Sequence, residues 1–439
     1  MRLISNNTLM SKEISTKELL RIWSKVAAHS FGGPAGQIAV IHQLVVEEKK
    51  IISEERFLHA LNFCMLLPGP EAQQLATYMG WLMSKWKGGL IAGGLFVLPG
   101  FLSILALSYL YVLFNDVSLV QGLFYGIKPA IIAIVLSALY RISKKSLKAF
   151  FYWFIASLAF IALFFFNISF PLVISCAAVL GIIYGKIYLN DQVQSQEKIE
   201  LPNSFQTIKT LITWLFIWSI PIFIVMFTLG THSNLYTLNL FFSKMSLVTF
   251  GGAYAALSYV AQEAVNVYGW LLSGEMLDGL ALAETTPGPL IQVVQYVGFM
   301  GAYRFPDIFH PLVAAFIGSV LTTWMTFAPC FLFIFTFAPY VEYIRNNKTF
   351  TYALSAITAA VVGVIFNLSL WFVLNALFLK NIKVSSYGFN FSLPILSSID
   401  IYASLICFIA LIMQFKFKAS LFKILGVSTA LGIFVKILL

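Results

Sequence analysis

Two pairs of glycine- and proline-rich motifs are the residues of this chain best suited to binding an anion. The first pair is Ser30-Phe31-Gly32-Gly33 with Pro68-Gly69-Pro70, and the second is Thr249-Phe250-Gly251-Gly252 with Pro287-Gly288-Pro289. Each motif interrupts an apolar stretch, where glycine permits a turn and proline favours the first position of a helix. Unpaired N–H groups and the dipole at such helix starts attract anions. The spacing therefore predicts half-helices that begin at the two Pro-Gly-Pro motifs and point at one anion site.

The second pair of motifs repeats the first at a constant distance. Residues with counterparts 219 positions downstream are Lys25 with Lys244, Ser30 with Thr249, Gly69 with Gly288, and Gln73 with Gln292. Such an ungapped match indicates an internal duplication. Duplicated halves with broken helices are how many secondary transporters build a substrate site near the bilayer midplane. Local helix packing, the alternative for a single break, explains a matched pair poorly.

Three lysines lie inside apolar segments, where a charge is costly and a function is the default interpretation. Lys25 and Lys244 precede Gly32 and Gly251 by seven residues, so each lies on the helical face of its glycine pair. They are predicted to compensate the charge of an anion, with snorkelling to the interface as the alternative. Lys128 is predicted to contact the substrate or, alternatively, to pair with a buried acid.

Two carboxylates flank the Pro-Gly-Pro motifs. Glu71 would lie in the first turn of a half-helix, where the dipole stabilises a carboxylate that would nevertheless compete with an anionic substrate. Glu284 would lie near the end of the preceding half-helix, which disfavours its charged form and makes it a candidate proton carrier. A structural role is the alternative for both, and Glu71 and Glu284 are the two proton-coupling candidates.

Glutamines after the breaks could donate amide hydrogen bonds to an oxyanion, or simply line a polar cavity. The predicted substrate-binding set is Lys25, Ser30, Gly32, Gly33, Gly69, Gln73, Gln74, Lys128, Lys244, Thr249, Gly251, Gly252, Gly288 and Gln292. The five histidines show no metal-ligand spacing, and the chain has no nucleophile elbow or phosphate loop. We therefore expect no enzyme, no metal and no cofactor.

The elements that must position these residues are membrane-embedded helices. Of the 439 residues, 59% are apolar and only 10% are charged, against about 25% charged in soluble domains. This composition excludes a soluble enzyme and a nucleic-acid binder. Uninterrupted apolar segments lie near 88–113, 118–140, 148–168, 170–188, 208–230, 309–338, 351–379, 391–415 and 419–438, and interrupted ones near 17–46, 54–84, 236–264 and 273–301.

The predicted fold is an all-α polytopic membrane protein of about 13 transmembrane segments, given the length of a span. It comprises two homologous six-helix halves and one linking helix. The odd number of intervening crossings would invert the second half, whether the interrupted segments all span or both of each half are re-entrant, a choice that the sequence leaves open. The predicted domains are a cytoplasmic N-terminal segment (1–16), a first repeat (17–188), a polar linker (189–207), a linking transmembrane helix (208–230) and a second repeat (231–439). Most Lys and Arg residues would then share the side of the N-terminus, which the positive-inside rule places in the cytoplasm.

The motifs together resemble the chromate ion transporter family in its long, two-domain bacterial form. The residues that carry the resemblance are Ser30–Gln37 (SFGGPAGQ), Leu66–Tyr78 (LLPGPEAQQLATY), Thr249–Tyr254 (TFGGAY) and Ala283–Ile291 (AETTPGPLI). The resemblance implies efflux of chromate across the bacterial inner membrane, driven by the electrochemical gradient and giving chromate resistance. Some members of the family are expected to move sulfate instead.

The predicted partners are a chromate or sulfate dianion, the lipid bilayer and a coupling proton, with no nucleic acid. Because chromate and sulfate are dianions of similar size, the residues do not choose between them. A transporter of sulfate or another oxyanion, and a passive anion channel, are the alternatives. A channel would dissipate gradients without concentrating its substrate. Both a monomer and a homodimer are compatible with the sequence.

Overall fold

The structure, a computed structural model, describes residues 14–31, 33–114, 116–189, 204–250, 252–340, 348–386 and 388–438. Its first half contains α1 (Thr16–His29), α2 (Gly33–His42), the π-helix η1 (Gln43–Glu48), α3 (Glu54–Cys64), α4 (Glu71–Phe114), α5 (Ser118–Ser146), α6 (Phe150–Phe164) and α7 (Phe170–Leu189). The linking helix is α8 (Ser204–Leu229). Of the predicted domains, residues 1–13 and 190–203 lie outside the described residues.

The second half contains the same kinds of element in the same order. These are α9 (Asn234–Val248), α10 (Ala253–Gln262), the π-helix η2 (Glu263–Val267), α11 (Ser273–Thr285), η3 (Leu290–Gln292), α12 (Val293–Arg304), α13 (Pro311–Phe337), η4 (Ala338–Tyr340), α15 (Lys348–Leu377), β1 (Asn381–Ser386), β2 (Phe389–Pro394), η5 (Leu396–Ser398), α16 (Ile401–Phe415) and α17 (Leu421–Leu438). The halves therefore share their helical plan up to the strands.

The duplication extends to details of the backbone. The π-helices η1 and η2 occupy equivalent positions, and each ends with the same bond across five residues. The N–H of Lys49 donates to the carbonyl of Leu44 at 3.1 Å, and the N–H of Tyr268 donates to the carbonyl of Glu263 at 2.9 Å. A shared π-helix, which is rare in proteins, supports the duplication inferred from the sequence.

The predicted helix breaks are present in the structure. We call Ser30–Gly33 and Thr249–Gly252 the glycine breaks, and Pro68–Pro70 and Pro287–Pro289 the proline breaks. Helices α4 and η3 begin directly after the two proline breaks. Helices α2 and α10 begin at the ends of the two glycine breaks. Since the first N–H groups of a helix have no partner within it, four such starts are available.

The interrupted segments do not form single continuous helices. Each segment splits at its break into two short elements that return to the surface where the segment began. In the second half, the side chain of Asn234 at the start of α9 donates to the carbonyl of Gly301 near the end of α12. Arg304 at the end of α12 pairs with Glu275 at the start of α11 at 2.9 Å.

The first half follows the same plan. Lys17 at the start of α1 and Lys49 at the end of η1 line one cavity, so this segment also begins and ends at one surface. Helix α4 turns back on itself at Ser84 and Lys85, whose backbone angles are not helical. A Cβ on Gly80 would lie 2.3 Å from the carbonyl oxygen of Gly88. Only glycine permits this close antiparallel contact between the two arms of α4.

Six of the described helices are long and apolar enough to cross a membrane. They are Glu71–Phe114, Ser118–Ser146, Phe170–Ile187, Ser204–Leu229, Pro311–Tyr340 and Thr351–Leu377, with shorter apolar helices at Phe150–Phe164 and Ile401–Phe415. The predicted span at 391–415 is wrong in its first part. There β1 and β2 pair as an antiparallel hairpin, with Asn381 opposite Pro394, and the helix starts only at Ile401.

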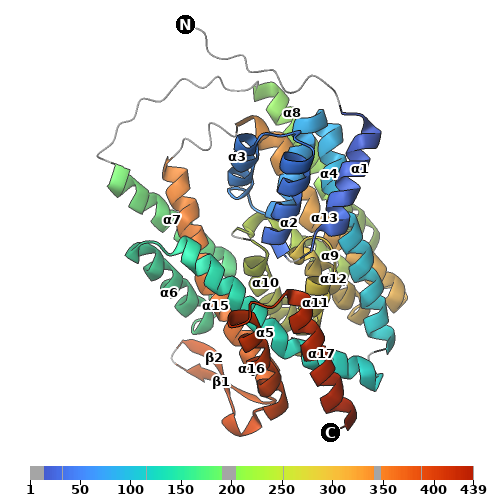
Figure 1. Cartoon of the computed structure of the whole chain (residues 1–439), viewed down its shortest axis with the longest axis vertical. Helices are drawn as coiled ribbons and strands as arrows, with labels where there is room; N and C mark the ends of the chain where they lie inside the picture. Colours follow the sequence, from blue (N-terminus) through green and yellow to red (C-terminus); the bar gives the residue numbers. More distant parts are fainter. Residues whose placement is uncertain are drawn as a thin grey trace.

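The two halves exchange helices as they pack (Figure 1). Helix α5 of the first half packs against α16 and α17 of the second, and α15 of the second packs against α6 and α7 of the first. These six helices form what we call the α5/α15 group, at the lower left of Figure 1. Helices α1–α4 and α8–α13 form the hairpin group, which contains all four breaks. Helices α10 and α11 of the hairpin group contact α5 and α15.

Candidate functional site

Two reciprocal hydrogen bonds join the four breaks in two pairs. The N–H of Gly69 donates to the carbonyl of Thr249 at 2.7 Å, and the N–H of Gly288 donates to the carbonyl of Ser30 at 2.8 Å. Each proline break is therefore bonded to the glycine break of the other half. Such a mutual relation is the signature of pseudo-twofold symmetry. Helix starts from both halves thus lie next to one another within each pair, as an anion site shared between the halves requires.

The proline breaks are tightly packed and require glycine. Gly69 has a φ of 119° and Gly288 a φ of 104°, a backbone region that other residues rarely adopt. A Cβ on Gly288 would lie 3.0 Å from the Cα of Gly100 in α4, and a Cβ on Gly69 would lie 2.9 Å from the Nε2 of Gln74. The proline breaks therefore leave no room for a ligand.

The glycine breaks, in contrast, border open space. No heavy atom lies within 4 Å of a Cβ built on Gly33, and only the Oε1 of Glu71, at 3.8 Å, lies within that range of one built on Gly252. Gly32 and Gly251, which the sequence also assigns to the site, lie outside the described residues. The space for a ligand is thus beside Gly33 and Gly252, next to the starts of α2 and α10.

Of the two acids predicted near the breaks, one lies beside the open space. Glu71 is in the first turn of α4 and faces Gly252 at the start of α10, so its carboxylate lies near two helix starts. Glu284 is buried near the end of α11, and its Oε1 accepts a hydrogen bond from the hydroxyl of Tyr254 at 2.8 Å. Arg141 of α5 lies within electrostatic range of Glu284. Glu71 therefore borders the space beside Gly252, whereas Glu284 has a structural partner in the protein interior.

The predicted hydroxyl groups donate to their own helices. The Oγ of Ser30 donates to the carbonyl of Val26 at 2.7 Å, and the Oγ1 of Thr249 donates to the carbonyl of Met245 at 2.6 Å. These bonds use the hydroxyl protons, so the two side chains fix the ends of α1 and α9. Their contribution to the site is structural in this state, because an anion needs donors.

Three glutamines near the breaks donate hydrogen bonds through their amides, and a fourth has no hydrogen-bond partner among the described residues. The Nε2 of Gln74 donates to the carbonyl of Pro68 at 2.6 Å, and the Nε2 of Gln292 donates to the Oε1 of Gln295 at 2.7 Å. Gln37, which sequence reasoning missed, donates to the carbonyl of Gly288 from the other half. Gln73 is fully buried, and neither of its amide atoms has a hydrogen-bond partner among the described residues. Its amide is therefore available to a ligand.

Two of the predicted lysines lie away from the breaks. The Nζ of Lys25 pairs with the Oε2 of Glu48 at 3.0 Å, and both side chains are about half exposed. Lys244 is also exposed. Lys25 lines a cavity of about 320 Å³ that also contains Lys17, Arg21 and Lys49. The structure thus places Lys25 in a cavity lined mostly by basic side chains rather than at the glycine breaks.

Lys128 takes the alternative that the sequence left open for it. Its Nζ lies 3.2 Å from the Oδ2 of Asp278 in α11, and this oxygen also accepts a hydrogen bond from the hydroxyl of Tyr111 at 2.9 Å. Lys128 therefore forms an ion pair with a buried acid and does not face the open space at the breaks. Sequence reasoning missed Asp278, although a lone acid in an apolar stretch is itself a signal of function.

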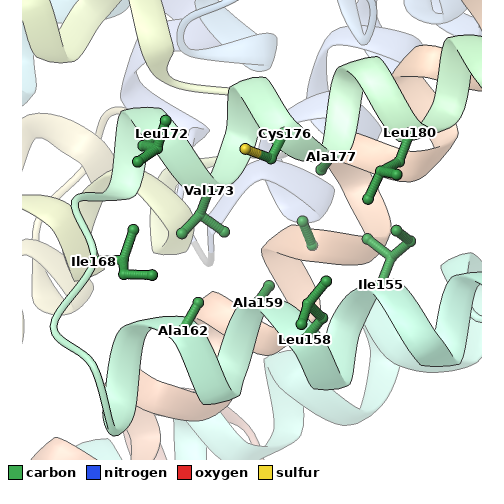
Figure 2. Close-up of a pocket in the computed structure, with 11 residues that line it drawn as sticks. Ile155, Leu158, Ala159, Ala162, Ile168, Leu172, Val173, Cys176, Ala177 and Leu180 are labelled. Atoms are coloured by element: carbon green, nitrogen blue, oxygen red, sulfur yellow. The ribbon is translucent and has the colours of Figure 1, made fainter. Parts of the chain in front are cut away.

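The apolar cavities of the chain are not suited to a dianion. Figure 2 shows one of about 230 Å³ between α6 and α7, around Cys176. Its labelled side chains carry no charge and no hydrogen-bonding nitrogen or oxygen. A second cavity, of about 530 Å³, lies between α4, α5, α11 and α17 and is also largely apolar. Because an unpaired charge is costly to bury in such surroundings, the breaks remain the candidate anion site.

A family profile and several known proteins match this chain. The sequence profile of the family described as Chromate transporter matches residues 17–182 and 236–433. A "Chromate transport protein" from Pseudomonas aeruginosa is 32% identical over 358 residues, covering 80% of this chain and 80% of the relative. A "Probable chromate transport protein" from Synechococcus elongatus is 29% identical over 351 residues, covering 80% of this chain and 83% of the relative.

A further "Chromate transport protein", from Cupriavidus metallidurans, is 28% identical over 353 residues and covers 80% of each chain. No solved structure matches the chain significantly. The family profile spans both repeats and includes all four breaks. The chain, a multi-pass membrane protein and a transporter rather than an enzyme, therefore belongs to the chromate transporter family.

Proposed function

We propose that the protein is a secondary active transporter that exports chromate across the bacterial inner membrane and so confers chromate resistance. The observation that carries the proposal is the reciprocal bonding of the breaks, which collects helix starts from both halves around open space beside Gly33 and Gly252. Helix starts favour an anion through their N–H groups and dipoles. Sulfate, a dianion of similar size and charge, is proposed as a second substrate.

The dianion would lie against the starts of α2, α4 and α10. The buried amide of Gln73 is its side-chain donor, since no other described group uses that amide. Gly69, Gly288, Gln74 and Gln37 shape the site by fixing the proline breaks, and Gln292 donates to Gln295 just after the second of them. This division of roles deepens the sequence prediction, which gave all these residues the same function.

The membrane potential is the proposed driving force. Each elementary charge that crosses 100 mV is worth about 2.3 kcal/mol. The export of a dianion from a cell with a negative interior is therefore favoured by about 4.6 kcal/mol of free energy per 100 mV. A coupling proton, with Glu71 and Glu284 as its candidates at the site, would make transport depend on pH as well.

The exchanged packing of the halves supports a mechanism of alternating access. We propose that the N-terminus is cytoplasmic and that the two halves have inverted orientation. The single linking helix α8 favours inversion because it makes the number of crossings between equivalent elements odd. The hairpin group, which contains every break, would move against the α5/α15 group and expose the site to one side and then to the other. Inverted repeats with broken helices support this kind of movement in other transporters.

Uptake into proteoliposomes tests the proposed function. With labelled chromate and an imposed membrane potential, we expect the purified protein to concentrate the anion on the positive side, and unlabelled sulfate to compete. Vesicles with the same potential but without protein are the control. Because the potential also draws a dianion through a passive channel until electrochemical equilibrium, the distinguishing result is accumulation driven by a pH gradient at zero membrane potential, which a channel would not show. A sulfate-specific transporter would show sulfate flux without chromate flux.

The double variant Lys25→Ala with Lys244→Ala is expected to raise the KM for chromate about threefold to tenfold at low ionic strength. We propose that these two exposed lysines draw the dianion toward the breaks by long-range attraction, which salt screens over about 10 Å at 0.1 M. The difference should therefore shrink as salt is added, while the maximal rate stays similar. Initial rates in proteoliposomes provide the measurement.

Lys383→Ala, on the exposed strand β1, is the matched control for the loss of a surface charge. It should leave the KM unchanged at every salt concentration. An unchanged KM in the double variant at low salt would show that Lys25 and Lys244 do not serve the substrate.

A further inference from the structure

A buried ion pair connects the two groups of helices. Lys128 belongs to α5 of the α5/α15 group, and Asp278 belongs to α11 of the hairpin group. Their Nζ and Oδ2 atoms are 3.2 Å apart, with 4% of the Asp278 side chain and 28% of the Lys128 side chain exposed. If the hairpin group moves against the α5/α15 group, this pair is under direct strain from the movement.

One carboxylate oxygen of Asp278 accepts no hydrogen bond from the described residues. Its Oδ2 is held by Lys128 and by the hydroxyl of Tyr111, whereas its Oδ1 is buried without a hydrogen-bond partner among the described residues. The ring of Tyr296 from α12 packs edge-on against Tyr111 at 5.6 Å. A buried unpaired carboxylate oxygen is costly, and a proton on Oδ1 would remove the charge that causes the cost.

The other charges on neighbouring elements are already matched. Glu275, one turn earlier on α11, accepts two hydrogen bonds from Arg304 of α12, at 2.9 and 3.0 Å. Lys128 is thus the cation that faces Asp278, and Tyr111 and Tyr296 are the neutral groups around it. Among the described residues, the ion pair of Asp278 is with Lys128, a cation from the other group of helices.

We infer that Asp278 binds the coupling proton of the transporter and that its protonation releases Lys128, unlocking the hairpin group from the α5/α15 group. The inference rests on the proposed function, because it assigns the coupling step of that transport cycle. The proton adds to Oδ1, the carboxylate becomes a neutral acid, and no other bond forms or breaks. Lys128 keeps its charge, which the passing dianion can then offset.

Glu71 and Glu284 differ from Asp278 in where their contacts lie. Glu71 faces Gly252, and Glu284 accepts a hydrogen bond from Tyr254, so the direct contacts of both acids lie within the hairpin group. Lys145 and Arg141 of α5 attract Glu71 and Glu284 only over a longer range. Among these three acids, and within the described residues, only Asp278 forms a direct ion pair between the two groups of helices.

The surroundings of the pair allow both proton access and movement. The Lys128 side chain keeps 28% of its exposure, so the pair is not sealed on that side. The cavity of about 530 Å³ is lined by Tyr111 and by Ile127, the neighbour of Lys128. Thr285, two residues before a proline break, also lines this cavity, so space for movement lies between the two groups of helices beside the ion pair.

The test compares transport driven by voltage with transport driven by a pH gradient in proteoliposomes. Asp278→Asn should retain voltage-driven chromate flux while the ratio of rates with and without a pH gradient falls to unity. Because one uncompensated lysine can impair folding, the double variant Asp278→Asn with Lys128→Met, which removes both charges, is measured beside it. Asp278→Glu should restore the response.

Glu275→Gln, one turn away on the same helix, is the matched control and should keep the wild-type ratio. Glu71→Gln and Glu284→Gln should also respond to the pH gradient. A pH response in Asp278→Asn equal to that of the wild type would overturn the inference, and so would its loss in Glu284→Gln with Asp278→Asn unaffected.

An infrared measurement separates failure of this inference from failure of the proposed function. Between mildly alkaline and acidic pH, the wild type should gain the carbonyl band of a protonated carboxylic acid, which Asp278→Asn should lack and Glu275→Gln should keep. If the wild type carries no chromate but shows this band, the proposed function is wrong and Asp278 still binds a proton. If the band persists in Asp278→Asn, the proton site is elsewhere.

Discussion

Gly288→Ala is expected to lower the rate of chromate transport by about tenfold to a hundredfold, while the chain still inserts into the membrane. The φ of 104° at this residue is strained for alanine, and the added Cβ would lie 3.0 Å from the backbone of Gly100. The proline break would have to move, and the hydrogen bond from Gly288 to Ser30 would lengthen or break. Initial rates in proteoliposomes, normalised to the amount of inserted protein, provide the measurement.

Gly230→Ala separates the effect of a strained backbone from the effect of close packing at the proline break. Gly230 also has a positive φ, of 81°, but no heavy atom lies within 4 Å of its would-be Cβ. This variant should lose about 1–2 kcal/mol of stability from the backbone alone and transport chromate at nearly the wild-type rate. A wild-type rate in Gly288→Ala, or equal losses in both variants, would show that the close packing of the proline break is not needed for transport.

Glu71→Gln is expected to tighten the binding of chromate to the purified protein by about tenfold at neutral pH. The carboxylate of Glu71 faces Gly252 at the start of α10, so it lies beside the space proposed for the dianion. Like charges a few ångströms apart repel by about 1 kcal/mol per pair in water and by more in a less polar medium. Glutamine keeps the shape and removes the repulsion. Isothermal titration calorimetry measures the change.

Glu47→Gln is the control for this variant. Glu47 is an exposed acid in η1 of the same half, where it pairs with His42 at 3.2 Å. Its loss should not change the affinity. Weaker chromate binding in Glu71→Gln would mean that Glu71 supports the anion, for example by carrying a proton to it, and would contradict the competition proposed here.

The sequence predicts the local features of this fold well, because they are encoded within a few residues. Gly-Gly and Pro-Gly-Pro in apolar stretches indicate where α2, α4, α10 and η3 begin, and the repeat distance predicts which elements correspond. The convergence of the breaks also follows from the duplication. What the spacing does not contain is the pairing: that Gly69 bonds to Thr249, and Gly288 to Ser30, depends on how the halves fit together.

Hydropathy also fails to distinguish a spanning helix from a helical pair that returns to its own side. Both are apolar over a similar length, and only contacts between the two ends of a segment, such as that of Glu275 with Arg304, tell them apart. At 391–400, apolarity alone suggested helix, yet Phe389–Pro394 pairs with Asn381–Ser386 as strands. Asp278 was missed for a similar reason, since its partner Lys128 lies 150 residues earlier on another helix.

The reciprocal bonding of the breaks has a consequence for how the protein is made. The carbonyl of Ser30 accepts a hydrogen bond from the N–H of Gly288, which is synthesised 258 residues later. Because unpaired backbone groups are costly in hydrocarbon, the first half cannot reach its final form while it is alone in the membrane. Ribosome and insertion machinery must therefore deliver a chain whose early hairpins remain adaptable until the second half arrives, so that the two halves finish folding as one event.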